Sequence, residues 1–334
     1  MNEYDIIRTI AAQFPRSKDQ LSNPFECDAE LIKIGNQVWG LTMDDFSPDE
    51  DLFTSDHPEA LGANLAVATL SDLLAAGIEP RFFMHALSIP RNAPSTFIEG
   101  VTEGIRMVLA KANCTLCGGD LGTADPWRYC GFAMGPACSA RPLTHKLPST
   151  PQTLWVTGTL GDANLAVLQN GSTPLFELRL KEAAAIQRCA TGCIDTSGGL
   201  LDAIWILHEL NPGIRFDIHA EQIPLAIGIR EYAQRVGLPA EAALVGGAGE
   251  YELLFAAPKN LSDSSKHELQ KMGITVIADL SISNTPGVHI QRNGEIIGTM
   301  TSPPPCPRAE ETVSDHVKAV AGFTRTLFGA MEWK

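Results

Sequence analysis

The sequence lacks the features that would place it on a membrane or a nucleic acid. No apolar run reaches the ~18 residues that a membrane-spanning helix needs. Positive charge is scarce as well, because 25 Lys and Arg face 39 Asp and Glu, which gives a formal net charge of −14. Nucleic acids and anionic lipids are bound by basic surfaces. We therefore expect neither a membrane nor a nucleic acid as a partner.

An export signal and a disulfide framework are also lacking. The first helix-like stretch, residues 3–14, carries acidic residues instead of the cationic front and apolar middle of a secretory signal. Eight cysteines in 334 residues without such a signal are typical of a reducing compartment. We therefore expect a cytoplasmic protein.

The common nucleotide-binding and hydrolytic motifs are absent too. No G-x-x-x-x-G-K-[ST] occurs, and no G-x-G-x-x-G follows a strand-like segment, so neither a P-loop nor a Rossmann fingerprint is indicated. The glycine-rich residues 246–249 have the wrong spacing for either. Cys114 and Cys117 form a C-x-x-C without a second pair, which fits small buried side chains better than a structural zinc site.

The sequence does contain strand-like and helix-like segments in alternation. Their periodicity predicts an α/β protein in two lobes of similar size, residues 1–140 and 152–334, joined by a Pro-, Ser- and Thr-rich linker at 139–153. The expected strands are 37–43, 81–89, 114–117, 128–136, 154–158, 214–218, 251–257, 274–279 and 287–291. The expected helices are 3–14, 59–76, 95–112 (with Ser95 as N-cap), 177–190, 200–210 and 309–329. Helix 59–76 is apolar on nearly all faces and should be buried.

Acidic residues gather just after the first expected strand. Seven of the sixteen residues from Asp44 to Glu59 are acidic, with no Lys or Arg among them. Such a run is either a solvated loop or a segment that a cation neutralises. Asp44 itself ends the strand, and strand ends are where ligands usually sit in α/β sheets.

Other aspartates stand singly at the ends of apolar segments or inside them. With Asp44 they form the set Asp28, Asp44, Asp72, Asp120, Asp162 and Asp195. Many carboxylates without a P-loop suit Mg²⁺, a hard cation that bridges carboxylates to substrate phosphates. Structural roles compete with this interpretation: a paired buried carboxylate at Asp72, a turn at Asp120, and helix caps at Asp162 and Asp195.

The ordered short motifs resemble thiamine-monophosphate kinase, in the superfamily of aminoimidazole ribonucleotide (AIR) synthetase. The likeness extends over residues 2–260 without a break in order. Its segments are 2–7 (N-E-Y-D-I-I), 26–29 (E-C-D-A), 42–44 (T-M-D), 70–77 (L-S-D-L-L-A-A-G), 118–120 (G-G-D), 156–163 (V-T-G-T-L-G-D-A), 194–200 (I-D-T-S-G-G-L) and 246–255 (G-G-A-G-E-Y-E-L-L-F).

The resemblance implies a two-lobed AIR synthase-like fold. Residues 1–140 would form the ATP- and Mg²⁺-binding lobe, which builds a β-barrel across a homodimer, and residues 152–334 the C-terminal α/β lobe. It implies ATP and Mg²⁺ as cofactors and in-line phosphoryl transfer to a small acceptor. The implied metal ligands are Asp28, Asp44, Asp72 and Asp120. The implied cofactor-binding residues are Thr42, Gly118, Gly119, Asp120 and Asp162, and the implied catalytic residues are Asp195 and Glu250.

Several positions depart from the family pattern. Cys27 replaces the first Asp of G-D-D, Gly198 replaces the second Asp of I-D-I-S-D-G-L, and Gly249–Glu250 replaces the E-D of G-G-E-D-Y-E. The family's V-E-G-V-H-F reads P-D-E-D-L-F at 48–53, and no G-W-D-H-F occurs near Trp333. Three hypotheses stay open: a thiamine-monophosphate kinase, a relative with the same Mg·ATP site and another substrate, and a non-catalytic nucleotide-binding or scaffold protein.

Overall fold

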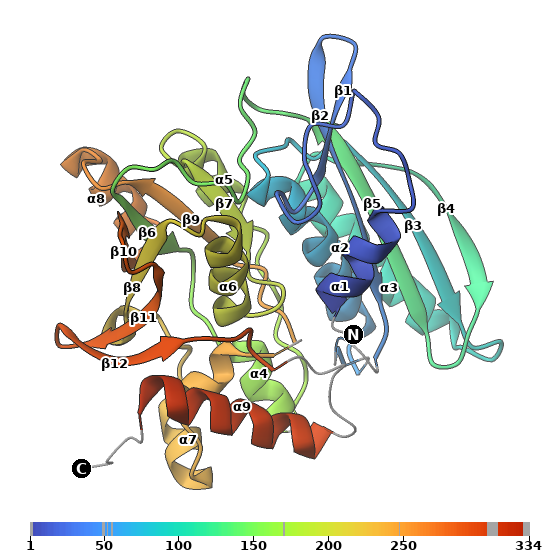
Figure 1. The fold of residues 1–334 in the computed structure, drawn as a ribbon. Coiled ribbons are helices and arrows are strands. Elements are labelled where there is room, and N and C mark those ends of the chain that lie inside the picture. Colours follow the sequence, from blue (N-terminus) through green and yellow to red (C-terminus); the bar gives the residue numbers. More distant parts are fainter. Residues whose placement is uncertain are drawn as a thin grey trace.

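The chain folds into two lobes, each built on its own sheet (Figure 1). The computed structural model describes residues 3–48, 51, 53–54, 56–169, 171–246, 248–305 and 313–329. Residue 2 of the opening motif, Asp49 and Glu50 of the acidic run, Gly247 and Trp333 lie outside these ranges. Within them, none of the helices combines the length and apolarity needed to cross a bilayer.

The first lobe is a five-stranded sheet with helices on one face. Its strand order is β1-β2-β5-β3-β4, with β3 and β4 parallel and the other neighbours antiparallel. The strands are β1 (Glu30–Ile34), β2 (Gln37–Phe46), β3 (Phe82–Ile89), β4 (Thr115–Thr123) and β5 (Arg128–Pro136). The helices are α1 (Glu3–Ala11), α2 (Pro58–Ala75) and α3 (Ser95–Lys111). The sheet is open, with β1 and β4 at its edges.

Helix α2 is buried almost all round, as its composition predicts. It packs on α3 at glycines in both helices, because a Cβ at Gly62 would lie 2.0 Å from the Val101 carbonyl oxygen and one at Gly104 would lie 2.0 Å from that of Glu59. The two backbones are therefore closer than any side chain would allow.

The second lobe is a seven-stranded sheet of order β12-β11-β8-β10-β6-β9-β7. The strands are β6 (Gln152–Val156), β7 (Gly192–Asp195), β8 (Ile214–His219), β9 (Leu253–Pro258), β10 (Thr275–Ile282), β11 (Gly287–Arg292) and β12 (Glu295–Met300). The helices are α4 (Asp162–Leu168), α5 (Leu180–Ile186), α6 (Leu200–Leu210), α7 (Ile229–Val236), α8 (Asp263–Lys271) and α9 (Val313–Phe328), with 3₁₀ turns η1 (Ala220–Gln222) and η2 (Ala240–Leu244). Strand β7 is an edge strand that runs toward the first lobe (Figure 1).

A segment of the second lobe, residues 171–179, docks onto the first lobe and is called the clasp below. Thr54 and Thr173 exchange backbone-to-hydroxyl hydrogen bonds of 2.8 and 2.9 Å. The buried Asn64 of α2 donates to the Pro174 carbonyl at 2.8 Å and accepts from the Phe176 amide at 2.9 Å. One hydrophobic core, which includes Leu70 and Phe255, continues from lobe to lobe.

Most expected elements are present, with several shifted boundaries. Strand β2 continues through Asp44 to Phe46, and β4 continues through residues 118–120. The expected helix 177–190 is shorter, at α5. Ser95 is the first residue of α3 rather than its N-cap, which is Pro94. The described part of the expected helix 309–329 is α9; residues 306–312 lie outside the described ranges. Strands β1, β7 and β12 and helices α7 and α8 had no sequence-based prediction.

Candidate functional site

Three carboxylates from distant parts of the chain converge where the lobes meet. Asp28 precedes β1, Asp72 lies in α2, and Asp195 ends β7. One oxygen of each lies within 4.8 Å of the others, a spacing that suits a shared metal ion. The Asp195 amide donates to Asp28 Oδ2 at 3.2 Å across the lobe boundary. We call these residues, with Asp44, the carboxylate cluster.

Neighbouring hydroxyls fix the orientation of the cluster. Thr42 of β2 donates a hydrogen bond to Asp72 Oδ2, which places β2 and α2 side by side here. Because side chains alternate along a strand, Asp44 projects from the same face of β2 as Thr42. Ser71 donates to Asp195 Oδ2 at 2.5 Å and so ties α2 to β7.

The cluster carries strong electrostatic repulsion. Burial, followed by the charge of Asp195, raises the pKa of Asp44 to about 7. Burial and the charge of Asp28 raise the pKa of Asp195 to about 6, and burial and the charge of Asp44 raise that of Asp72 well above its usual range. Among the described residues, none of the four carboxylates forms an ion pair with a Lys or Arg. A cation held by these oxygens would remove the repulsion.

The donor set fits Mg²⁺. The carboxylates of the cluster and the hydroxyls of Thr42 and Ser71 offer oxygen, the ligand atom that a hard divalent cation prefers. The competing explanation for Asp72, a pair with Arg or a backbone donor, does not match its surroundings, where the Thr42 hydroxyl is the partner. Asp195 does accept from the backbone and hydroxyl of Ser197, so it closes a turn in addition to facing the cluster.

The remaining expected residues lie elsewhere. Gly118, Gly119 and Asp120 stand on the exposed edge strand β4, so Asp120 lies in a strand and not in a turn. Asp162 is exposed in the first turn of α4, whose N-cap is Gly161, so Asp162 is not the cap.

Glu250 is buried against α4. Its carboxylate accepts a hydrogen bond from the Gly161 amide, and burial raises its pKa well above the usual range. The Glu250 carboxylate is therefore hydrogen-bonded to the N-terminal end of α4.

Two side chains at the cluster escaped sequence reasoning. His145, in the linker between the lobes, lies with its Nε2 3.1 Å from Asp28 Oδ1. Burial opposes its positive charge, but the charge of Asp28 and hydrogen bonding raise its pKa overall. Tyr251 is buried among Phe53 and Phe176, and its φ of +57° is unusual for a residue with a side chain. Tyr251 belongs to a quoted motif, whereas no local pattern marks His145.

Comparison with known proteins agrees with this arrangement. Residues 26–137 match the family model described as AIR synthase related protein, N-terminal domain. Thiamine-monophosphate kinase from Archaeoglobus fulgidus is 26% identical over 84% of this chain and 93% of its own length. The enzyme of that name from Pyrococcus abyssi is 26% identical over 89% and 93%. The chain is thus similar to thiamine-monophosphate kinases, and its residues 26–137 match an AIR synthase-related N-terminal domain.

Solved structures share the fold of this chain. A ThiL structure in complex with AMPPCP and TMP superposes with a TM-score of 0.72 at 21% identity, over 88% of this chain and 94% of its own. The hydrogenase maturation protein HypE of E. coli superposes with a TM-score of 0.66 at 16% identity, over 85% and 95%. The two-lobed α/β architecture expected from the motifs is thus confirmed.

Proposed function

We propose that the protein is a Mg²⁺-dependent, ATP-using phosphotransferase that converts thiamine phosphate and ATP to thiamine diphosphate and ADP. The observation that carries the proposal is the carboxylate cluster at the lobe boundary, in a chain whose relatives are named thiamine-monophosphate kinase. The structural neighbour in complex with AMPPCP and TMP supports the same pair of substrates.

The chain's own residues would bind and orient the phosphates. Asp28, Asp72 and Asp195, whose oxygens lie within metal-binding distance of one another, would hold Mg²⁺. Asp44, which interacts with them through its charge, would assist, and Thr42 and Ser71 would fix Asp72 and Asp195. When bound, Mg²⁺ would neutralise the phosphate oxygens and stabilise the charge of the transferred phosphoryl group. We propose that four exposed residues approach the nucleotide. They are Gly118, Gly119 and Asp120 on the edge strand β4, and Asp162 in α4. Glu250 would act indirectly, by holding the start of α4.

The family departure at Gly198 is partly offset by a neighbour. A Cβ at this position would lie 2.6 Å from Asp202 Oδ2, in the first turn of α6. The Asp202 carboxylate therefore takes the space that a side chain at 198 would enter.

The decisive experiment is a steady-state assay of ADP release with Mg·ATP and thiamine monophosphate. We expect turnover that depends on both Mg²⁺ and the acceptor. Absence of turnover at any substrate concentration would refute the kinase. Binding of Mg·ATP in a calorimetric titration without such turnover would favour the second candidate, a relative with another acceptor, which the altered segment 48–53 supports. No binding at all would favour the scaffold.

We further propose that residues 1–140 and 152–334 are the two domains and that the protein is a cytoplasmic homodimer. The two sheets support the domain division, and the seven described free cysteines support a reducing compartment. Met43, Phe82 and Met84 project, 66%, 38% and 44% exposed, from the sheet face opposite α2, where a second copy would bury them and could close a barrel. Light scattering should give a dimer mass that Met84→Asp lowers to the monomer; a monomeric parent protein would contradict the proposal.

A further inference from the structure

The imidazole of His145 is fixed between two oxygen atoms. Nδ1 lies 2.6 Å from the Phe25 carbonyl oxygen. Nε2 lies 3.1 Å from Asp28 Oδ1, which is an ion pair when the ring is protonated, although the two atoms are not aligned as a hydrogen bond. The residue is only 3% exposed. Phe25 has a φ of +66°, so the loop that carries Asp28 has a backbone conformation that must be held by its surroundings.

The backbone of His145 is fixed as firmly as its ring. Its amide donates to the Glu26 carbonyl at 2.8 Å, and its carbonyl accepts from Asn211 Nδ2 at 2.8 Å. Asn211 is itself buried, donates to the Leu207 carbonyl and accepts from the Leu147 amide. Because the backbone is held, the ring can leave Asp28 only by a side-chain rotation that breaks the contact of Nδ1 with the Phe25 carbonyl.

Asp28 is held from both sides as a result. Its Oδ2 accepts from the Asp195 amide, and its Oδ1 faces His145. The contact of His145 with the cluster is to Asp28, so it acts through that carboxylate. Within the described part of the chain, it is the one basic side chain whose ion pair reaches the carboxylate cluster.

We infer that His145 is a positioning residue for the cation site, which orients Asp28 and thereby sets the affinity for a divalent cation. The inference rests on the proposed Mg²⁺ site. Residues that orient a metal ligand typically change metal affinity about 10–100-fold when they are removed. His145 lies in the linker, so the segment that joins the lobes contributes a residue to the site.

The test compares two substitutions that each keep one of the two ring contacts. The amide of His145→Asn overlays Nδ1 and keeps the donor to Phe25, but does not reach Asp28. The longer His145→Gln brings a donor to the position of Nε2. Lys146→Gln serves as the matched control, because Lys146 is the neighbouring cation and pairs with Glu26 at 3.8 Å, outside the cluster.

The measurement is Mn²⁺ binding to the full chain without nucleotide, followed through the electron paramagnetic resonance signal of free Mn²⁺, together with Tm in the absence of cation. We expect His145→Asn to raise the Kd for Mn²⁺ about 10–100-fold. His145→Gln should restore most of the affinity, and Lys146→Gln should match the parent protein.

An unchanged Kd in His145→Asn would overturn the inference. So would equal losses of affinity in both His145 variants accompanied by equal losses in Tm, since those would indicate a structural role only. Failure of the parent protein to bind Mn²⁺ would instead remove the cation site, and with it the proposed function.

Discussion

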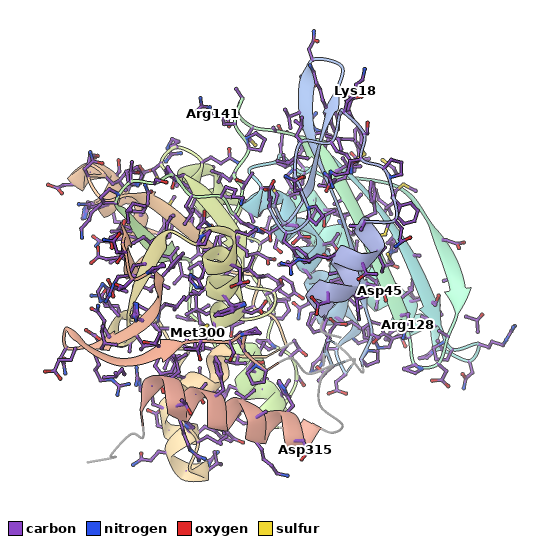
Figure 2. The ribbon with its side chains drawn as sticks, in the orientation of Figure 1. Lys18, Asp45, Arg128, Arg141, Met300 and Asp315 are labelled. Carbon is purple, nitrogen blue, oxygen red and sulfur yellow. The ribbon has the colours of Figure 1, made fainter. Side chains whose placement is uncertain are left out.

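At the scale of the residue, Asp44 and Asp45 show how one step along a strand separates two roles. Asp44 faces the cluster, whereas Asp45 lies on the other face, exposed and 3.3 Å from Arg128 (Figure 2). We predict that Asp44→Asn raises the half-saturating Mg²⁺ concentration about tenfold or more, because one ligand charge worth ~1.4 kcal/mol or more is lost. Asp45→Asn is the matched control and should leave it unchanged. Equal effects of the two variants in a Mg²⁺ titration of activity would contradict the assignment.

Asp72 gives a second prediction, which separates binding from folding. Asp72→Asn should remove Mg²⁺-dependent nucleotide binding and leave the fold intact, because the amide keeps the size of the side chain and accepts from Thr42. Without cation the variant should be more stable than the parent, since its charge is repelled by Asp44 and Asp195. Calorimetric titration with Mg·ATP and thermal unfolding measure the two effects; unchanged affinity would exclude Asp72 as a ligand.

The raised pKa values also predict how stability changes with pH. An unfolded Asp titrates near ~3.9, but Asp195 titrates at about 6 and Asp44 at about 7 when folded. Between these values the folded state binds more protons, so the free energy of unfolding falls as pH rises through this range.

Without cation, Tm should therefore fall from pH 5 to pH 8, and saturating Mg²⁺ should raise Tm more at pH 8 than at pH 5. Asp44→Asn should flatten the pH dependence of the cation-free protein. An equal effect of Mg²⁺ on Tm at both pH values would show that the cluster does not hold the cation.

Single residues also show where sequence reasoning ends. Asp28, Asp44, Asp72 and Asp195 could be selected because each stands by itself beside an apolar segment. That rule also selected Asp120 and Asp162, which have the same local pattern and lie outside the group. Nothing in the sequence around His145 marks it, because its partner Asp28 is more than a hundred residues away and only the folded chain brings them together.

At the scale of the element, the packing of α2 on α3 depends on glycine. Gly→Ala in a helix gains up to ~1 kcal/mol in intrinsic helix propensity. At Gly104 the added methyl would lie 2.0 Å from a backbone oxygen, and such overpacking costs about 1–3 kcal/mol or more. We predict that Gly104→Ala destabilises the protein by about 1–3 kcal/mol in urea unfolding.

Gly322→Ala in α9 is the control, because no atom lies within 4 Å of the added Cβ. It should be neutral or stabilising by up to about 1 kcal/mol. If Gly104→Ala behaved like Gly322→Ala, the close approach of the two helices would be wrong.

Elements differ in how far their sequence predicts them. Helix α2 is long and apolar, and β5 alternates regularly, so both were predicted within a residue of their bounds. The hairpin of β11 and β12 turns at Asn293–Gly294, both with positive φ, and this dipeptide is a recognised hairpin signal in the sequence. Helix α7 has no clear apolar pattern because it is short and polar, so the sequence does not predict it, although Gly228 and Gly237 mark its two ends. The sequence predicts only the first part of edge strand β4, because the glycines that follow are typical of a turn.

At the scale of the whole molecule, the clasp joins the lobes next to the cluster. Asn64→Ala would leave the Phe176 amide and the Pro174 carbonyl without their partner, and a buried group in that state costs about 1–3 kcal/mol. We predict a matching loss of stability and faster tryptic cleavage after Arg179. Asn92→Ala, at an exposed asparagine between β3 and α3, should change neither. Cleavage at the parental rate would show that the clasp does not depend on Asn64.

The relation between the lobes is what the sequence predicts least. The two sheets follow from local patterns, but the contact of Asp28 with the Asp195 amide joins positions 167 residues apart. No periodicity encodes such a contact, which depends on the core shared by the lobes and on the clasp.

The position of Asp195 has a consequence for when the carboxylate cluster can form during synthesis of the chain. Strand β7 is an edge strand, hydrogen-bonded to β9, which ends at Pro258. On the ribosome, the first lobe emerges with Asp28, Asp44 and Asp72 already present and their mutual repulsion unrelieved. Asp195 can take its place only after the chain has grown past β9. In the proposed cation site, Asp195 would therefore be the last ligand to take its place, because its strand pairs with a segment translated well after it. Most of the chain would be synthesised before the site could form.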